Sequence, residues 1–447
     1  AEPLSHLMPL KRRDFLKIAG AQVGLLAACR SAPPAFIPPG PLPPMPQRAP
    51  TQGGTTYDVI VVGAGAFGGW TAYHLRQLGV RVLLVDAYGP GNSRATSGDE
   101  TRGVRTSYGD RSGAQAEQWM RWANEAVARW TAWDAEWQRQ FRTQLFYNTG
   151  DIILRKEWDT FTKRTKELWD KIGIKHDVLP VDEVKKRWPV CDTTEIGVVL
   201  YEPQAGVVRA RRACEEVDEV FKMRGGEVKI AHGWLGTQTN GKLDHIVLSS
   251  NETVSAGQYV FACGPWLPKL FPELLGRIIR TPLGHVFYFA TPPADERFTF
   301  PNCPSWNYPG VTGWPALLPD NRGFRVRTGG DRMYDPDYSQ RWIQERSLKA
   351  SRQFVAQRFP LLAKAPINET RACHYELSAS RNFIIDKHPT MTNVWITGGG
   401  SAEGFKFGPV LGDFISKRVH GDAVDTVLAD AFKIPKITET PATGRRS

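Results

Sequence analysis

The chain has 447 residues, of which 41% are hydrophobic and 23% are charged. This composition is that of a globular protein and excludes a chain that is disordered throughout, and the length suits two interleaved domains or one large α/β unit. The formal net charge of +11 comes from Lys and Arg residues that are spread along the chain. Without a dense basic run or a nucleic-acid-binding motif, this charge favours an anionic substrate or a membrane surface over nucleic acid.

Residues 1–29 are predicted to be an export signal. Arg12 and Arg13 stand before "FLK" and a short apolar run that ends at Ala28, a pattern that resembles a twin-arginine signal. The run is too short to be a permanent transmembrane helix. Because the twin-arginine export machinery carries proteins that are already folded, the segment indicates a cofactor-containing enzyme that acts outside the cytoplasm.

Cys29 ends the sequence "LAAC", which resembles a lipobox. Two outcomes stay open. One is acylation of Cys29, which would anchor a lipoprotein to the membrane, and the other is ordinary cleavage with release into the periplasm. Residues 30–55 are rich in Pro and suit neither a helix nor a central strand, so they are predicted to be a stiff linker.

A dinucleotide-binding module is predicted at residues 57–87. A buried strand, a glycine-rich turn and a helix to about Leu78 are followed by a second strand that ends at Asp86. The glycines permit a tight turn and close approach to a pyrophosphate, which the helix N-terminus attracts. An acidic residue such as Asp86 can accept a hydrogen bond from a ribose hydroxyl, which favours FAD or NAD over NADP. The residues of the turn that are predicted to contact the cofactor are Gly63, Gly65, Ala66, Phe67 and Gly68.

FAD is favoured over NAD because the module stands at the start of the folded chain and because two later segments suit a flavin. The strand in "GQYVFACGPW" runs into a turn at Gly264. Residues 393–419 are predicted to form a strand, a glycine turn with Gly404 and Phe405, and a helix that starts near Pro409. The N-terminus of such a helix can face the pyrimidine edge of a reduced flavin.

Three motifs together resemble the FAD-dependent amine oxidoreductases of the D-amino-acid oxidase superfamily. They are the glycine turn, "SGDETRGVRTSYGD" at 97–110 and "CHYELSASRNFIIDKHP…GFKFGP" at 373–409. The resemblance runs from about Tyr57 to about Asp422 and is greatest to the group of monomeric sarcosine, N-methyltryptophan, pipecolate and fructosyl-amino-acid oxidases.

The resemblance implies roles for four residues. Arg102 is expected against the flavin, Arg105 and Lys406 are expected to bind the substrate carboxylate, and Cys373 is expected to form a thioether to the flavin ring. A guanidinium fork and an ammonium group are well suited to hold a carboxylate. Cys373 taken alone is open to another interpretation, that of a buried packing residue.

One position departs from the family pattern. Relatives that use oxygen carry a lysine over the flavin, and the strand at 321–330 places Arg325 there. Because an arginine is bulkier and permanently charged, two acceptors stay open. An oxidase that reduces oxygen to hydrogen peroxide is preferred to a dehydrogenase that reduces a quinone or another carrier. Trp314 is expected in the substrate pocket, above the flavin.

The scattered cysteines and a row of tryptophans are interpreted as structural. No pair of the six Cys residues has the spacing of a zinc site or of a disulfide framework, so no metal is predicted. Five tryptophans at helical spacing are predicted to form the buried face of an amphipathic helix. They are Trp119, Trp122, Trp130, Trp133 and Trp137.

The sequence thus predicts a mixed α/β flavoprotein with a Rossmann-like FAD-binding domain and a substrate domain built on a mixed or antiparallel sheet. The expected reaction is oxidation of the C–N bond of an amino acid or secondary amine to an imine, with a non-catalytic FAD-binding protein as the remaining alternative. Substrate-domain strands are expected near 145–155, 278–290 and 322–328. The predicted segments are 57–110, 185–275 and 370–432 for the FAD-binding domain, 111–184 and 276–369 for the substrate domain, and 433–447 for a polar tail.

Overall fold

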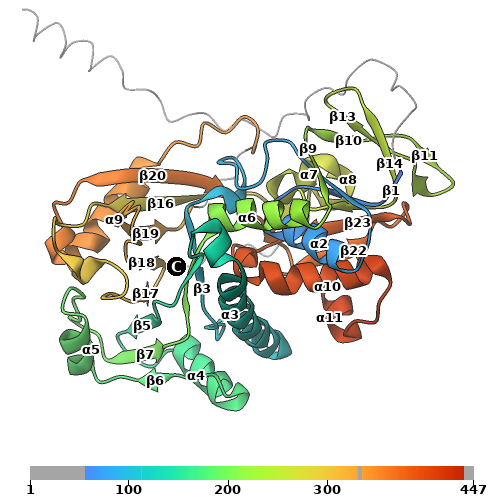
Figure 1. Ribbon diagram of the computed structural model, residues 1–447. Coiled ribbons are helices and arrows are strands. Elements are labelled where there is room, and N and C mark those ends of the chain that lie inside the picture. The colour runs from blue at the N-terminus through green and yellow to red at the C-terminus, as the bar shows by residue number, and fades with distance from the viewer. Residues whose placement is uncertain (1–55, 112, 331–334, 437–447) are drawn as a thin grey trace, which may run out of the picture. The chain divides into compact units, whose positions relative to one another are not determined.

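The computed structural model describes residues 56–111, 113–330 and 335–436 (Figure 1). These residues fall within one compact unit of the chain. The predicted export signal with Cys29, the linker and most of the polar tail lie outside the described residues. None of the helices in the described ranges has the length and hydropathy that a membrane crossing requires.

The first large sheet contains the predicted dinucleotide-binding module. Its strands are β1 (Thr56–Val62), β2 (Val82–Asp86), β9 (Glu227–Ile230), β10 (Gly233–Leu235), β13 (Ile246–Leu248), β14 (Thr253–Phe261), β22 (Ile384–Lys387) and β23 (Val394–Gly398). β1 lies between β2 and β14 and is parallel to both, while β9 and β23 extend the parallel part on either side. β10, β13 and β22 pair antiparallel at the margins. The predicted order of strand, turn, helix and strand is therefore confirmed, as is the mixed α/β class.

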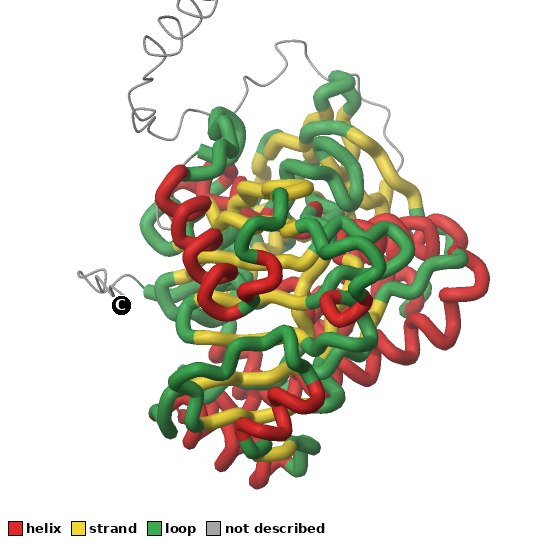
Figure 2. Tube along the Cα trace, turned by 90° about the vertical axis from the view of Figure 1, so that its left-hand side faces the viewer, coloured by secondary structure: helices red, strands yellow, loops and turns green. Residues whose placement is uncertain are grey.

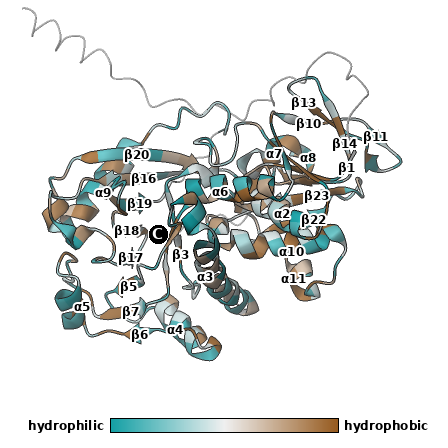
Figure 3. Ribbon diagram, in the orientation of Figure 1, coloured by the Kyte–Doolittle hydropathy of each residue, from teal (hydrophilic) through white to brown (hydrophobic). Residues whose placement is uncertain are grey.

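Both faces of this sheet are covered, which explains the continuous hydrophobic runs of its central strands. Along β1, Val59 and Val61 pack into one core, and Ile60 and Val62 pack into the other. Successive side chains of a strand point to opposite faces, so one strand supplies two cores. Figure 3 shows hydrophobic residues concentrated in these strands, in contrast to the hydrophilic peripheral helix α5 (Val181–Arg187).

Three helices cover one face of the first sheet. α2 (Ala66–Gln77) packs against α10 (Gly408–His420), and α6 (Ala210–Met223) packs beside α2. The long helix α3 (Gly113–Phe141) packs on α10 through the predicted tryptophan face. Four of the five predicted tryptophans are buried, and Trp137 is partly buried against the same core. The other helices are α4 (Thr160–Ile172), α7 (Leu267–Leu270), α8 (Pro272–Leu275), α9 (Glu345–Arg358) and α11 (Thr426–Ala431).

The second large sheet holds the strands that were expected in the substrate domain. In spatial order they are β20 (Ile367–His374), β16 (Leu283–Phe289), β19 (Phe324–Thr328), β18 (Val311–Trp314), β17 (Ser305–Tyr308), β5 (Asp151–Arg155), β7 (Val198–Glu202) and β6 (Asp177–Val178). All neighbours are antiparallel except β17 and β5. Figure 2 shows the strands of this sheet as a ladder of yellow segments.

Two strands of the second sheet, β7 and most of β20, come from segments that were assigned to the FAD-binding domain. β7 falls within 185–275, which was assigned to the FAD-binding domain, but it pairs with β5 and β6. Its hydrophobic sequence suits a buried strand in either sheet, so the pattern alone cannot choose between them. The predicted domain boundaries stay a prediction.

Three small sheets complete the described fold. β3 (Thr101–Val104) and β4 (Phe146–Tyr147) both pair with β8 (Gly206–Arg209). The short hairpin of β11 (Gln238–Thr239) and β12 (Lys242–Leu243) extends beyond the first sheet, and β15 (Ile279–Arg280) pairs with β21 (Leu377–Ser378). β3 carries Arg102 and leads directly to Arg105, so it brings the "SGDETRGVR" motif to the region between the two large sheets.

Candidate active site

A cavity of about 240 Å³ lies between the two large sheets. Residues at the carboxyl ends of β1, β2, β14 and β23 line one part of it, as expected for a nucleotide site in an α/β sheet. Residues of β16, β18, β19 and β20 line the other part. All the candidate site residues named from the sequence line this cavity, with the exception of Gly68.

The glycine turn after β1 leaves no room for larger side chains. Gly63 has a φ of +107°, and a Cβ there would approach the carbonyl oxygen of Ala262 to 2.4 Å. A Cβ on Gly68 would lie 1.8 Å from the carbonyl oxygen of Gly63. Gly68 therefore serves the close packing of α2 on the turn, whereas Gly65, Ala66 and Phe67 at the start of α2 face the cavity.

Asp86 organises the loop that follows β2. Its carboxylate accepts hydrogen bonds from the backbone N–H groups of Ala64 at 2.7 Å, Tyr88 at 2.8 Å and Gly89 at 2.8 Å. Burial raises the pKa of Asp86, and these backbone donors oppose that rise. A carboxylate offers about four acceptor positions, so one stays available for a ribose hydroxyl.

The cavity lining contains glycine backbone and a buried carboxylate that suit FAD. Gly264 (φ +52°) and Gly404 place backbone along it, in agreement with the predicted turns. Glu376, which the sequence did not single out, is buried and also lines the cavity, and its Oε1 has no hydrogen-bond partner among the described residues. Burial raises its pKa to about 7, against the opposing N–H groups of Gly399 and Gly400. A hydroxyl or N–H group of a bound cofactor would satisfy this oxygen.

Asp99 holds two arginines at the cavity wall. It forms ion pairs with Arg102, three residues away, and with Arg325 of β19, whose Nη2 lies 3.2 Å from Asp99 Oδ2. Tyr288 donates a hydrogen bond to the same carboxylate at 3.3 Å. Burial alone would raise the pKa of Asp99, but Arg102 and Arg325 outweigh it, and the pKa is lowered. The sequence reasoning missed Asp99 because nothing in the motif distinguishes it from neighbouring polar residues.

Arg325 lies at the cavity, as predicted, but as part of this ion-pair cluster. Its side chain is buried, and its guanidinium lies 3.8 Å from the ring centroid of Trp314. Trp314 in turn donates from Nε1 to the hydroxyl of Thr101 at 2.9 Å. Burial lowers the pKa of Arg325 and Asp99 opposes this effect. The stacking and the ion pair fix the guanidinium plane beside the cavity.

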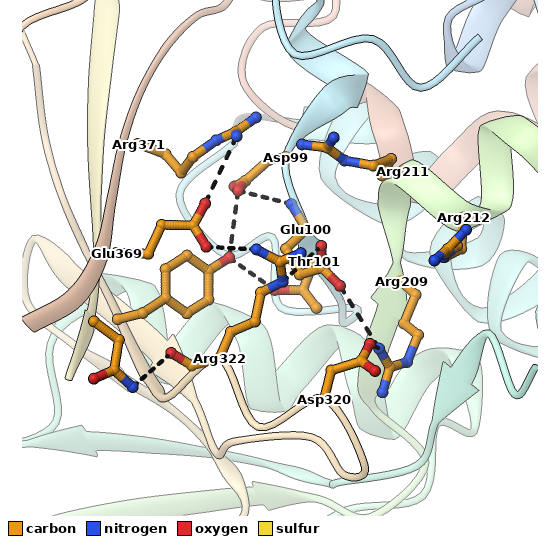
Figure 4. A network of polar contacts seen from close by, with 12 residues as sticks. Asp99, Glu100, Thr101, Arg209, Arg211, Arg212, Asp320, Arg322, Glu369 and Arg371 are labelled. Atoms are coloured by element: carbon orange, nitrogen blue, oxygen red, sulfur yellow. Dashed lines mark hydrogen bonds and ion pairs between the residues drawn. The ribbon is translucent and has the colours of Figure 1, made fainter. Parts of the chain in front are cut away.

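Further ion pairs connect the residues that lie next to Asp99 (Figure 4). Glu100 lies between Arg209 at 3.6 Å and Arg322 at 3.3 Å. Arg322 also contacts Glu369 at 2.7 Å, so the network joins β3 and β8 to the second sheet. Such a shared network fixes several side chains at a lower loss of conformational entropy than isolated pairs would.

The predicted carboxylate-binding residues line the same cavity among charged groups, where Lys406 is buried and Arg105 is partly buried. Lys406 lies in a short 3₁₀ turn (Gly404–Phe407) before α10 and donates from Nζ to Glu403 at 2.7 Å and to the Tyr108 hydroxyl at 2.7 Å. Burial lowers the pKa of Lys406, and Glu403 opposes this effect. Arg105 has its Nη1 3.7 Å from Asp151 Oδ1, and this Nη1 makes no hydrogen bond to the described residues. Glu403 and Asp151 were not predicted.

Cys373 lies on β20, opposite Gly284 of β16, and lines the cavity. Arg102 Nη2 lies 3.6 Å from its sulfur. All five cysteines of the described residues are free, so none of them is consumed by a disulfide there. Whether Cys373 bonds to a flavin stays a prediction.

Comparison with known proteins gives a single family. Residues 58–418 match the family described as FAD dependent oxidoreductase (DAO). The chain is 26% identical to monomeric sarcosine oxidase of Bacillus sp. (strain B-0618), across 81% of this chain and 92% of that protein. It is 25% identical to N-methyl-L-tryptophan oxidase of Yersinia pestis (strain Pestoides F), across 80% of this chain and 93% of that protein.

Solved structures support the same fold. L-proline dehydrogenase from P. horikoshii superposes with a TM-score of 0.71 at 18% identity, covering 83% of this chain and 95% of that one. A thermally stable mutant of fructosyl peptide oxidase superposes with a TM-score of 0.73 at 16% identity, covering 86% and 94%. Because the family match spans most of the described residues and the cavity suits the cofactor, the chain belongs to the FAD dependent oxidoreductase family and is an FAD-dependent enzyme.

Proposed function

We propose that this enzyme oxidises the C–N bond of an amino acid or N-alkyl amino acid to an imine. The observation that carries the proposal is a pair of cations in the cavity that also suits FAD, the buried Lys406 and the partly buried Arg105. Buried charges are expensive to maintain, and a substrate carboxylate would make use of both. The names of the relatives, sarcosine oxidase and N-methyl-L-tryptophan oxidase, denote enzymes of N-methylated amino acids and support the same substrate class.

The protein's own part is to bind and orient the amine. Arg105 would receive the carboxylate through the part of its guanidinium that lines the cavity. Lys406, fixed by Glu403 and Tyr108, would add a second charge. The bound FAD supplies the acceptor for the electron pair. Fixing the substrate by its carboxylate places the amine carbon in one position, and such positioning accounts for much of the rate enhancement in reactions of this kind.

Anaerobic mixing with amino acids tests the proposal. At least one N-methylated or unmodified amino acid should bleach the flavin absorbance of the purified, FAD-containing protein. The matched amine without the carboxylate should react at least about 10²-fold more slowly than the amino acid, because it cannot bind to Arg105 and Lys406. If no compound of a broad amine and amino-acid panel bleaches the flavin, the non-catalytic alternative is correct.

We further propose oxygen as the electron acceptor, with hydrogen peroxide as the product. Two guanidinium groups, Arg102 and Arg325, share the carboxylate of Asp99, so this cluster of three residues has one positive charge in excess. Positive charge beside the site favours the transient formation of superoxide. Stopped-flow reoxidation of the reduced enzyme by oxygen and by a quinone analogue decides between the two acceptors, and faster reoxidation by the quinone would favour the dehydrogenase.

We propose that the FAD is held covalently by Cys373. The support is the place of the sulfur in the cavity lining, where a bound flavin would be within reach, 3.6 Å from Nη2 of Arg102. Acid denaturation of the wild type should leave the yellow colour with the chain, and Cys373→Ser should release it completely. Cys263→Ser, which changes another cysteine of the cavity lining, is the matched control and should keep the colour. Free flavin in the acid supernatant of the wild type would contradict covalent attachment.

We propose that the enzyme is exported by the twin-arginine route and acts in the periplasm or as a lipoprotein anchored at Cys29. The support is the sequence pattern around Arg12 and Arg13. The double variant Arg12→Lys, Arg13→Lys tests the export route. In cell fractionation this variant should be found in the cytoplasm.

A further inference from the structure

Two carboxylates lie directly opposite each other behind Arg105. Asp151 of β5 and Glu202 of β7 are paired in the antiparallel register, and each residue is only 1% exposed. Residues in such positions have Cβ atoms about 5 Å apart, and like charges there repel each other. Two full negative charges without solvent are therefore unfavourable at this position.

The groups around the pair offer only partial compensation. Glu202 accepts from the backbone N–H of Thr106 at 3.1 Å through both oxygens. Neither oxygen of Asp151 has a hydrogen-bond partner among the described residues, and the nearest cation is Arg105. Ser305 of β17 lies opposite Asp151 on its other side. Further charges that act on the pair or on Arg105 come from Arg155 on β5 and from Lys406 and Glu403 before α10. Tyr108 after β3 is a further titratable group near Arg105, and burial keeps its pKa well above the ordinary value, so it is neutral here.

These surroundings favour a proton on the pair near neutral pH. Burial raises the pKa of Asp151 to about 6, with Arg105, Lys406 and Arg155 opposing the rise. Burial also raises the pKa of Glu202 to about 7, with the bond from Thr106 opposing and the charge of Asp151 adding to the rise. Because the two groups interact, the titration belongs to the pair as a whole.

We propose that Asp151 and Glu202 are positioning residues that share a proton behind Arg105, and that binding of a substrate carboxylate to Arg105 draws a proton from solvent onto this pair. The inference rests on the proposed function, in which Arg105 receives the carboxylate. In the free site, the charge of Arg105 stabilises ionised Asp151. A carboxylate bound from the cavity side shares that charge, so the balance moves toward protonated Asp151, and no covalent bond changes.

The sign of the pH dependence follows from this linkage. Below about pH 6 the pair already carries its protons, so carboxylate affinity should not change with pH. Above about pH 7 the pair is ionised in the free site, and binding requires proton uptake. The affinity should then fall by at most about tenfold per pH unit for one proton.

Acetate binding to the FAD-containing protein measures the effect. The dissociation constant is followed through the flavin spectrum between pH 5 and about pH 9, and proton uptake is followed with an indicator dye in weak buffer. The wild type should take up as much as about one proton per acetate at pH 8. Acetamide, which has no charge, should show no uptake. Acetate binding to the wild type without proton uptake would overturn the proposal.

Asp151→Asn mimics the protonated state of Asp151, so its dissociation constant for acetate should depend less on pH than that of the wild type, and it should take up fewer protons. Glu216→Gln is the matched control. Glu216 is also buried, and burial raises its pKa to about 7, but it lies on α6 beside Trp133 and does not line the cavity. This variant should keep the wild-type pH profile, and a loss of uptake in it as in Asp151→Asn would overturn the assignment.

Infrared spectroscopy separates failure of this inference from failure of the proposed function. The wild-type difference spectrum between pH 6 and pH 8 should contain the bands of several protonated carboxyl groups, and one band that is absent from the Asp151→Asn spectrum should be retained in that of Glu216→Gln. If acetate does not bind but the band behaves in this way, the proton-sharing pair is correct and the carboxylate site is wrong. If the band is unchanged in Asp151→Asn, the pair does not hold the proton and the inference is wrong.

Discussion

Replacing Arg105 by methionine is expected to lower kcat/KM for the amino-acid substrate by about 10³-fold. Truncation of one partner of a buried charge pair costs roughly 2–5 kcal/mol, and every 1.4 kcal/mol corresponds to about a factor of ten. The loss should appear mainly as a higher KM, because the carboxylate is bound both in the substrate complex and in the transition state. Steady-state kinetics with the substrate found by flavin bleaching measure both constants.

The fold should tolerate the Arg105→Met change. Without its cation, Asp151 stays buried but can take a proton, because burial already raises its pKa to about 6. The matched control is Arg129→Met. Arg129 is paired with Glu125 and Asp413 on the surface of α3 and α10, away from the cavity lining. This control should keep kcat/KM within about twofold of the wild type.

An amine without a carboxylate gives the decisive comparison. It should react equally slowly with the wild type and with Arg105→Met, because the arginine has nothing to hold. An equal fall in rate for the amine and for the amino acid would contradict the role of Arg105 in substrate binding. It would point instead to general damage of the cavity.

The cofactor half of the cavity could be predicted from the sequence because its signals are local. The glycine turn at Gly63, the helix after it and Asp86 at the end of the second strand lie within one short segment. Their spacing follows from a single strand–helix–strand unit, so no long-range contact has to be known. Arg105 and Lys406 came from the family resemblance, and the structure places both at the cavity.

The acidic partners could not be predicted because they depend on pairing between distant strands. Asp151 and Glu202 meet only because β5 pairs with β7, which lies in a segment assigned to the FAD-binding domain and was not predicted as a strand. Asp99 meets Arg325 across more than two hundred residues of chain. A carboxylate in a sequence of ordinary charge content gives no sign that it will be buried, so these counterions emerge only from the tertiary structure.

Replacing Asp99 by asparagine is expected to lower the free energy of unfolding by about 3–5 kcal/mol. The change leaves the buried Arg325 and the partly buried Arg102 without their shared carboxylate. Breaking a buried ion pair by removing one partner is strongly destabilising, because the other charge stays desolvated. Urea unfolding of the FAD-containing protein, followed by circular dichroism, measures the difference.

The pH dependence of this loss distinguishes an ionic role of Asp99 from a steric one. The pKa of Asp99 is lowered in the folded state, so its stabilising contribution is complete above its ordinary pKa and is lost as the pH falls toward the folded-state pKa. The difference in the free energy of unfolding between wild type and Asp99→Asn should therefore become smaller in acid. Asp58→Asn, which removes the carboxylate of an exposed pair with Arg81, should change stability little at any pH. If the difference in the free energy of unfolding stays constant down to strong acid, Asp99 stabilises the cavity lining through its hydrogen bonds alone. Another group would then have to balance the charge of Arg325.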